Sequence, residues 1–369
     1  MKLSPFKLEE FWKKYEFSTP YLLCPSDCES WSLNEILAMG DSETKGLWDS
    51  LQLNYTESPG LPLLRKEIAL QYDIPIENVL TTAGAEEGIY CAMQALIEQG
   101  DEVIVITPCY QSLKSLPKAI GAIVHEIPLT PDWGIEINVI KKLVSAKTKM
   151  IVLNIPHNPT GSIPDKNIYQ TLIDLAKAHG TYIFCDEVYQ GLEVNEQDRL
   201  PSIATIYEKG ISLNVMSKSY GLAGLRIGWL VSQDKGFIEK ANSYKLYTSI
   251  CNSAPSEILA LIALRAKVKI LSRNREIMMK NLEAYDRFFA KYPKLFTWKR
   301  PQAGSVAFPE FHGEEIDRFT DLLAKEAGIL IMPASIYDMK GNYFRIGLGR
   351  RNVPEILARF EEFLSRKID

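Results

Sequence analysis

The chain has 369 residues, of which 46% are hydrophobic and 24% charged, and its formal net charge is −4. These values are typical of an ordinary globular protein and give no reason to expect nucleic acid or an anionic membrane as a partner. The longest purely apolar run, residues 258–264, is too short to span a bilayer, and residues 1–6 show no signal-peptide pattern. A cytoplasmic protein is therefore expected.

The six cysteines and four histidines are dispersed along the chain. Cys24 and Cys28 form a close pair, but no second pair completes a four-ligand zinc site, so no structural metal is expected. In a reducing compartment most of the thiols are expected to be free and buried.

The first 20 residues carry aromatic side chains at roughly helical spacing and predict an amphipathic N-terminal arm, followed by a short helix over 33–39. From residue 79 onward, apolar runs alternate with helical patterns, which predicts an α/β domain with a mostly parallel seven-stranded sheet covered on both faces. The expected strands are 79–82, 102–106, 122–127, 149–153, 181–185, 211–216 and 227–231, and the expected helices are 85–99, 112–120, 135–144 and 165–179.

After about residue 252 the pattern changes to that of a smaller α+β domain. Ser256 is expected to cap one very long helix that reaches toward Tyr292. Further elements are expected at 304–308 (strand), 316–327 (helix), 329–332 and 343–348 (strands) and from 353 on (helix). The expected division is 1–45 (N-terminal arm and part of the small domain), 46–252 (large domain) and 253–369 (small domain).

Polar residues follow the ends of three successive predicted strands. After the first, residues 154–161 include two prolines and a glycine that restrict the loop and hold the Asn158 amide in one direction, although such a composition is also typical of an ordinary turn. After the second comes Asp186, with Tyr189 three residues later. A carboxylate there is costly to bury unless a cation meets it, and a solvated strand-end acid is the alternative.

The third strand end carries Lys218. Among apolar neighbours a lysine is partly desolvated, which lowers the amine pKa as a Schiff-base lysine requires. The glycines that follow allow a tight turn that brings Arg226 back beside Lys218. A surface lysine in a flexible loop is the alternative interpretation.

The order and content of these strand ends, with the motifs N-P-x-G (158–161), D-E-x-Y (186–189) and S-K-x-x-G-x-x-G-x-R-x-G (217–228), resemble the class I and II aminotransferases of fold type I, the family related to aspartate aminotransferase. The resemblance covers nearly the whole chain. It implies pyridoxal 5′-phosphate as cofactor and transfer of an amino group between an L-amino acid and a 2-oxo acid.

The resemblance also assigns roles at the centre of the site. It implies that Lys218 holds the cofactor as a Schiff base and later moves a proton. Asp186 is expected to pair with the pyridine nitrogen, and Asn158 and Tyr189 to bind the cofactor's 3-hydroxyl oxygen. Arg345, in a strand-like run near the C-terminus, is expected to bind the substrate α-carboxylate beside Asn158.

The phosphate is expected to be held by Ser217 and Arg226. A strand-to-helix turn adds Gly84, Ala85 and Glu86, whose backbone N–H groups suit an anion at a helix N-terminus, although such turns are common.

Two tyrosines complete the implied site. Tyr110 is expected to stack on the cofactor ring, with a core tyrosine as the alternative. Tyr55 is expected to reach the phosphate of a partner subunit, which implies a homodimer with shared active sites.

The sequence departs from the family pattern at three places. Val215 replaces the usual Ser or Thr three residues before the lysine. Ala85 and Glu86 replace hydroxyl residues that are common in the phosphate turn. Residues 24–27, Cys-Pro-Ser-Asp, replace a glycine-containing substrate segment. These departures leave the identity of the substrate open.

Two other functions use the same residues. The carbanion chemistry of such a site also permits β-elimination or cyclisation, and residues 24–29 and 247–257 faintly resemble capreomycidine synthase and its relatives, which cyclise a hydroxylated arginine. A cofactor-sensing module of the kind fused to transcription factors is the non-enzymatic alternative, but the sequence contains no basic DNA-binding region.

Overall fold

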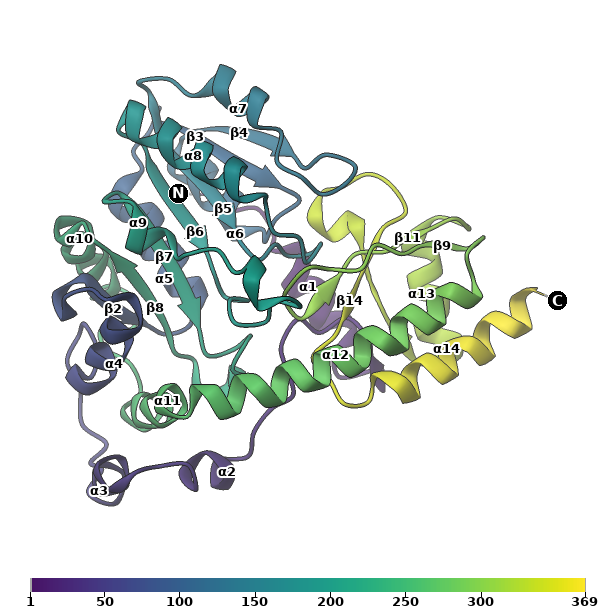
Figure 1. Ribbon diagram of the computed structural model, residues 1–369, viewed down its shortest axis with the longest axis horizontal. Helices are drawn as coiled ribbons and strands as arrows, with labels where there is room; N and C mark the ends of the chain where they lie inside the picture. Colours follow the sequence, from purple (N-terminus) through teal and green to yellow (C-terminus); the bar gives the residue numbers. More distant parts are fainter. Residues whose placement is uncertain (1, 369) are drawn as a thin grey trace.

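The computed structural model describes residues 2–368 and contains a central sheet with the strand order β2-β8-β7-β6-β5-β3-β4 (Figure 1). Only β8 runs against its neighbours β2 and β7, and all other pairs are parallel. The mostly parallel seven-stranded sheet is therefore confirmed, with every strand bound within one residue of the expected one. The strands are β2 (Val79–Thr82), β3 (Glu102–Thr107), β4 (Ile123–Pro128), β5 (Thr148–Asn154), β6 (Tyr182–Asp186), β7 (Gly210–Val215) and β8 (Gly228–Ser232).

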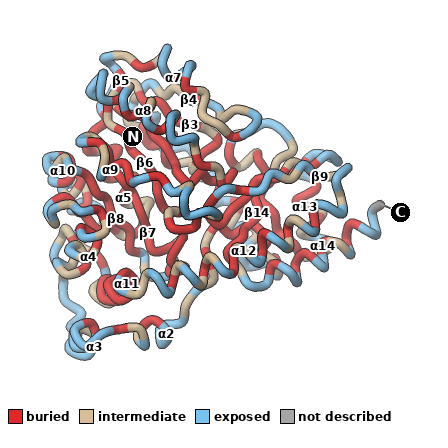
Figure 2. Tube along the Cα trace, in the orientation of Figure 1, coloured by how far each residue is buried: buried red, intermediate tan, exposed pale blue. Residues whose placement is uncertain are grey.

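Alternate residues of each central strand enter two different cores. In β3, Val103 and Val105 pack with α5, α6 and α10, whereas Ile104 and Ile106 pack on the opposite face with α7 and α8. The two-residue side-chain period of a strand produces this division. Figure 2 shows the sheet as the buried centre of the molecule. The covering helices are α5 (Ala85–Leu96), α6 (Ser112–Ile120), α10 (Lys235–Lys245), α7 (Ile137–Leu143), α8 (Lys166–His179) and α9 (Ile203–Ile206).

The β2 edge of the sheet is covered by helices from distant parts of the chain. Val79, Trp229 and Val231 pack with α4 (Pro62–Tyr72) and α11 (Ala254–Arg265). The short helices α2 (Leu33–Leu37) and α3 (Ser42–Asp49) lie against α11 in turn.

The expectation of one long helix capped by Ser256 is wrong. The helix is divided into α11 and α12 (Lys267–Lys291) at Ala266, whose ψ of 13° departs from helical geometry, and the N-cap of α11 is Ser253. The two helices serve different cores, because α11 packs beside the large sheet while α12 contributes Met278 and Phe288 to the second core. A single straight helix would not pack against both cores.

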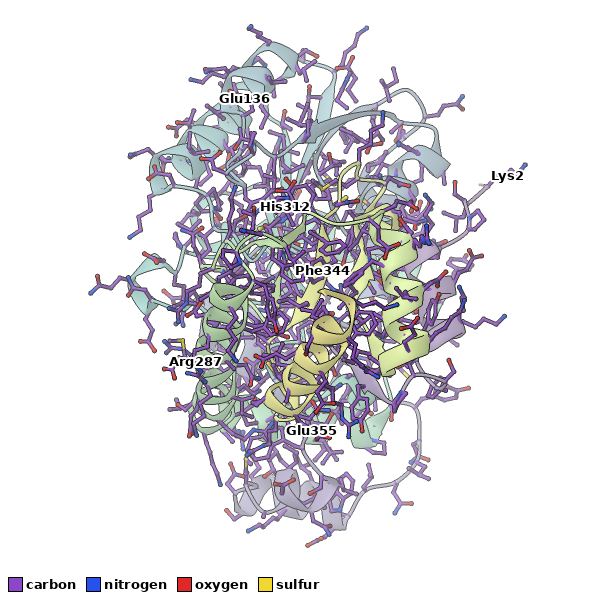
Figure 3. All side chains as sticks on the ribbon, turned by 90° about the vertical axis from the view of Figure 1, so that its right-hand side faces the viewer. Lys2, Glu136, Arg287, His312, Phe344 and Glu355 are labelled. Atoms are coloured by element: carbon purple, nitrogen blue, oxygen red, sulfur yellow. The ribbon has the colours of Figure 1, made fainter. Side chains whose placement is uncertain are left out.

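The second core is built from short strands and three helices. The strands β10 (Val306–Ala307), β14 (Phe344–Gly347) and β13 (Met332–Pro333) form an antiparallel sheet against α12, α13 (Ile316–Ala327) and α14 (Val353–Ile368). Figure 3 shows Phe344 at the centre of this region, with the exposed Arg287 and Glu355 on its outer helices. The expected strand over 304–308 is reduced to two residues.

The N-terminal segment belongs to this second region. Strand β1 (Tyr21–Leu22) pairs in parallel with β12 (Ile329–Leu330), and helix α1 (Lys7–Tyr15) precedes it. The remaining elements are β9 (Phe296–Thr297), β11 (Glu310–Phe311) and four 3₁₀ turns, η1 (Ile76–Asn78), η2 (Glu196–Asp198), η3 (Ala223–Leu225) and η4 (Ala334–Tyr337). The domain boundaries near residues 45 and 252 stay a prediction.

All six cysteines are unpaired, and five of them are buried. Within residues 2–368, no three His, Cys, Asp or Glu side chains are grouped so that they could hold a metal ion. Over the same residues, every helix is too short or too polar to cross a bilayer.

Candidate active site

The carboxyl ends of three parallel strands lie side by side. The register pairs Asn154 at the end of β5 with Asp186 at the end of β6, and Asp186 with Leu213 near the end of β7. Asn154 locks two of these ends together, because its Nδ2 donates to the Asp186 carbonyl (2.9 Å) and its Oδ1 accepts from the Asn158 N–H (2.7 Å). Ligands bind at this edge of open α/β sheets.

A cavity of about 470 Å³ opens at these strand ends. It brings together most of the site residues expected from the sequence. They are Ala85, Glu86, Tyr110, Asn158, Asp186, Tyr189, Ser217, Lys218, Arg226 and Arg345. Two expected residues, Gly84 and Tyr55, are not in its lining, and they are described below.

Lys218 is half-buried in the wall of the cavity. Its Nζ donates a hydrogen bond to Ser26 Oγ at 2.8 Å. Burial lowers the pKa of the Lys218 amine; the nearby Asp27 opposes this shift and Arg345 adds to it. The amine is thus held in a place that favours its neutral, nucleophilic form, as its position at a strand end predicted.

Within residues 2–368, no cationic group forms an ion pair with the buried carboxylate of Asp186, although the charge of Lys218 is close enough to lower its pKa slightly against the effect of burial. The residue is 5% exposed, and its carboxylate accepts a single hydrogen bond among the described residues, from the Val188 N–H at 3.2 Å. Burial raises the pKa of this carboxyl to about 7. An acid held so far from its ordinary pKa is suited to a cationic group placed in the cavity.

Arg226 and Ser217 lie on the loop after β7. Arg226 Nη1 is 3.4 Å from Ser217 Oγ, and Arg226 itself has a left-handed backbone with φ of 52°. Gly84 has a φ of 90°, which favours glycine, and a Cβ there would lie 2.5 Å from Arg226 Nη2, so that the arginine would have to shift. Gly221 is equally constrained, since its φ is 69° and a Cβ would lie 2.5 Å from the Glu29 carbonyl oxygen.

The N-terminus of α5 faces the same part of the cavity. Ala85 is its first residue, Gly84 is its N-cap, and no side chain caps the helix. The Glu86 side chain is occupied elsewhere, because its carboxylate accepts from Ser112 Oγ at 2.7 and 2.8 Å. Burial raises the pKa of Glu86. The groups available to bind an anion at this turn are therefore backbone N–H groups and the Arg226 guanidinium.

Arg345 is the most buried cation of the cavity, with 1% of the residue exposed. Its Nε donates to the Cys24 carbonyl (3.1 Å), and its Nη1 donates to Tyr337 Oη (2.6 Å) and Asn158 Oδ1 (3.3 Å). Among the described residues, Nη2 has no hydrogen-bond partner. This fixed guanidinium is suited to a carboxylate.

The remaining predicted residues have simple placements. Tyr189 and Val215 pack together in one small apolar cluster at the cavity wall. Tyr110 lies at the wall next to the N-terminal segment, with its ring centroid 5.4 Å from that of Phe6. Tyr55 lies outside this cavity on the surface and is 86% exposed.

Sequence reasoning missed several groups that line the cavity. Arg350 and Asp27 form an ion pair at 2.5 Å, and Glu9 and Glu16 come from the N-terminal arm. No motif marks Arg350. The arm was recognised by its helical spacing, but nothing in that spacing says which of its faces meets the cavity.

The sequence profile of the family described as "Aminotransferase class I and II" matches residues 49–360. Three curated relatives cover most of the chain. A (5-formylfuran-3-yl)methyl phosphate transaminase of Methanocaldococcus jannaschii is 34% identical over 85% of this chain and 84% of its own. An aspartate aminotransferase of Pyrococcus horikoshii is 29% identical over 84% and 83%. The capreomycidine synthase of Streptomyces vinaceus is 28% identical over 92% and 88%.

Among solved structures, a PLP-dependent aminotransferase from Streptococcus suis 89-1591 superposes with a TM-score of 0.93. It is 31% identical, and the match covers 99% of each chain. The chain belongs to the class I and II aminotransferase family. It is an enzyme of fold type I that uses pyridoxal phosphate to move amino groups between amino acids and oxo acids.

Proposed function

We propose that Lys218, Asp186 and Arg345 form the catalytic centre of this transaminase and that the amino acid and the oxo acid bind in turn in the cavity that they line. The observation that carries the proposal is the unpaired, buried carboxylate of Asp186 in the same cavity as the desolvated amine of Lys218. A buried carboxylate is costly unless a cation pairs with it, so the site favours a ligand that brings a cationic group to Asp186.

The lining of the cavity fits pyridoxal phosphate. Asp186 pairs with the ring nitrogen and keeps it protonated. Arg226, Ser217 and the backbone N–H groups of Ala85 and Glu86 hold the phosphate, and Gly84 leaves room for the arginine.

Three further residues are proposed to contact the cofactor ring. Asn158 and Tyr189 bind the 3-hydroxyl oxygen, and Tyr110 packs against the ring. Val215 offers no hydroxyl, so the phosphate receives one hydrogen bond fewer than the family pattern supplies.

When bound, pyridoxal phosphate would act as an electron sink that makes the proton on the substrate Cα acidic. The protein positions and moves the proton. Lys218 would hold the cofactor and, as a neutral amine, would take the proton from the substrate Cα and return it on the cofactor side. Arg345 fixes the α-carboxylate of the substrate through its planar fork, and Asn158 orients the arginine.

The proposed reaction is tested by a half-reaction. The enzyme with bound cofactor is mixed with one amino acid, without an oxo acid, and its absorbance spectrum is followed. One equivalent of oxo acid per site, together with conversion of the cofactor to its amine form, supports transamination. Absence of any spectral change with a full panel of amino acids contradicts the proposal.

Elimination or cyclisation at the same site is the second candidate outcome. It is supported by the similarity to capreomycidine synthase over 92% of this chain. The same experiment separates the two, because elimination releases ammonia over many turnovers and leaves the cofactor spectrum unchanged at the end.

The proposed assembly is a homodimer. Large apolar side chains are exposed on two neighbouring segments, with Tyr55 86%, Leu53 85%, Tyr247 91% and Ile250 48% exposed. The segments are joined by a hydrogen bond from Thr56 Oγ1 to the Asn252 carbonyl at 3.3 Å. An apolar surface of this kind indicates a partner protein, and a second copy places Tyr55 near the cofactor phosphate of the partner subunit. The six unpaired cysteines support a cytoplasmic location.

A further inference from the structure

One face of helix α1 forms part of the active-site cavity. Leu8, Glu9 and Trp12 of α1 and its C-cap residue Glu16 line the cavity that also contains Lys218. Their spacing places them along one side of the helix. The N-terminal arm therefore contributes two carboxylates to the space in which the substrate binds.

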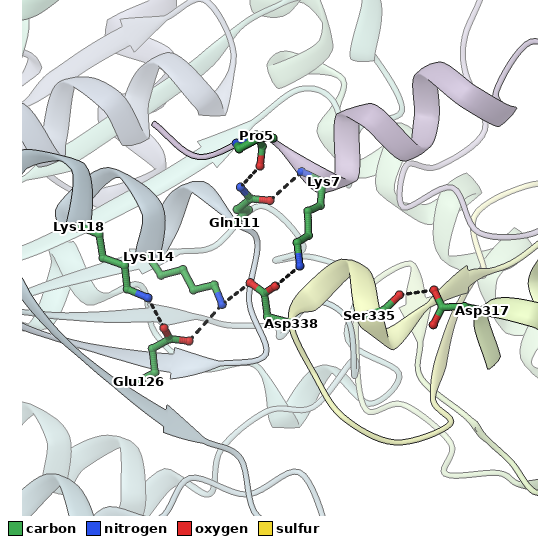
Figure 4. A network of polar contacts seen from close by, with 9 residues as sticks. All are labelled: Pro5, Lys7, Gln111, Lys114, Lys118, Glu126, Asp317, Ser335 and Asp338. Carbon is green, nitrogen blue, oxygen red and sulfur yellow. Dashed lines mark hydrogen bonds and ion pairs between the residues drawn. The ribbon is translucent and has the colours of Figure 1, made fainter. Parts of the chain in front are cut away.

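Both ends of α1 are anchored by other residues, as Figure 4 shows for the first end. There, Lys7 Nζ pairs with Asp338, and the Lys7 N–H donates to Gln111 Oε1 at 3.0 Å. At the second end, the Tyr15 hydroxyl donates to Asp321. These contacts determine the rotation of the helix and so hold Glu9 and Glu16 toward the cavity.

The charges in this part of the cavity do not cancel. Arg350 is already paired with Asp27 at 2.5 Å. The carboxylates of Glu9 and Glu16 form no ion pair and accept no hydrogen bond within residues 2–368. Glu9 lies close enough to Lys218 to oppose the lowering of its pKa. Glu9 and Glu16 are both exposed to solvent, and they place two unpaired negative charges at the rim of the cavity.

A second feature of the cavity points to a ligand independently of these acids. Arg345 is buried, and its Nη2 is without a hydrogen-bond partner among the described residues. A guanidinium N–H that faces the cavity is free to donate to a bound ligand, and the α-carboxylate of an amino acid supplies an acceptor. The rest of that amino acid shares the cavity with Glu9 and Glu16.

We infer that the amino-acid substrate carries a positively charged side chain, of the class of arginine, ornithine and lysine, whose cationic end is bound by Glu9 and Glu16. This inference rests on the proposed transamination at the Lys218 site. A second carboxylate on the substrate is disfavoured, because Arg350 is neutralised by Asp27 and both free glutamates repel an anion.

The test compares two amino acids of nearly the same shape in the half-reaction. L-Arginine and L-citrulline differ in the charge of the terminal group, and L-glutamate serves as the anionic competitor. The expected kcat/KM for arginine exceeds that for citrulline by about tenfold or more, as two partly exposed ion pairs provide. Glutamate is expected to be the poorest of the three.

Variants of α1 assign this preference to residues. The double variant Glu9→Gln/Glu16→Gln is expected to lower the arginine-to-citrulline ratio by about tenfold, mainly through the KM for arginine. Glu10→Gln is the matched control, since Glu10 is exposed on the same helix and outside this cavity. It removes one negative charge, against two in the double variant, and is expected to leave the ratio unchanged.

The possible results separate the inferred preference for a cationic substrate from the proposed transaminase reaction. Equal rates with citrulline and arginine, a preference for glutamate, or the same fall in the ratio for Glu10→Gln overturns the inference while the transaminase reaction stands. Failure of every amino acid to convert the cofactor overturns the proposed function itself.

Discussion

The side-chain amine of Lys218 donates a hydrogen bond to Ser26 Oγ at 2.8 Å, although 192 positions separate the two residues in the sequence. Ser26 lies in the N-terminal segment that follows β1, and Lys218 lies on the loop after β7. The contact closes the N-terminal segment over the strand ends of the large sheet.

Replacement of Lys218 by alanine is expected to abolish the visible absorbance of the lysine-bound cofactor and to lower turnover by about 10³-fold or more, because both the covalent anchor and the proton carrier are lost. Absorbance spectroscopy and the half-reaction measure the two effects. Lys209→Ala is the control, since Lys209 is half-buried outside the cavity and its amine donates to the Gly180 carbonyl (2.8 Å). Persistence of the full absorbance band in Lys218→Ala contradicts the assignment.

Asp186→Asn is expected to change how the stability of the cofactor-free protein depends on pH. The pKa of Asp186 is raised to about 7 in the folded state, above its ordinary value of 3.8, so the folded protein holds an extra proton between these values. Stability supplied by the protonated acid is present below pH 4 and is lost as the pH rises toward 7. Without this acid, the variant is expected to be more stable than the wild type at pH 8, by roughly 1–4 kcal/mol, and similar to it at pH 4.

Chemical denaturation at a series of pH values measures this difference, with Asp49→Asn as a surface control. Glu187, whose pKa burial also raises to about 7, continues to titrate in both proteins. With pyridoxal phosphate bound, the order is expected to reverse, because Asp186 then has a cationic partner. An identical pH dependence for Asp186→Asn and wild type counts against an unpaired carboxylate at this site.

Arg345→Lys is expected to raise the KM for the amino acid by about tenfold or more, because a lysine does not reproduce the planar two-nitrogen contact with a carboxylate. Tyr337→Phe is expected to raise KM less, since Tyr337 accepts a 2.6 Å hydrogen bond from Arg345 and acts by positioning it. Saturation of the half-reaction separates KM from the maximal rate. Arg318→Lys, on the exposed face of α13, is the control. A fall in maximal rate with KM unchanged for Arg345→Lys rejects its role in substrate binding.

Tyr247→Asp is expected to convert the proposed dimer to a monomer, because it places a charge on the exposed apolar surface proposed as the contact. Sedimentation velocity at several protein concentrations measures the change. Phe17→Asp is the control, since Phe17 is 94% exposed but lies on the N-terminal arm. The milder Tyr55→Phe is expected to keep the dimer and weaken cofactor binding. A wild-type protein that sediments as a monomer throughout removes the basis for both expectations.

Much of the fold follows from local sequence pattern. Continuous apolar runs located all seven strands of the sheet within one residue, because a strand buried on both faces leaves no polar position inside it. The failure at Ala266 has an equally physical cause. No glycine or proline marks the division between α11 and α12, and the bend arises only because the two helices pack on different cores.

The cavity residues divide in the same way. Lys218, Asp186 and Asn158 could be predicted because each lies at the end of a recognisable strand or in the loop after it, and parallel strands place their carboxyl ends together. Arg350 and Glu9 could not, because their place in the cavity depends on contacts between segments that are distant in the sequence.

The sequence by itself determined the sheet, the family and the residues at the strand ends, since hydrophobic periodicity and strand direction are local properties. Only the tertiary structure decided what surrounds Lys218. It brought Ser26 to the amine, paired Arg350 with Asp27, and directed Glu9 and Glu16 into the cavity. The anchors at the two ends of α1 set the side of the helix that meets the substrate, and such contacts leave no periodic signal in a sequence.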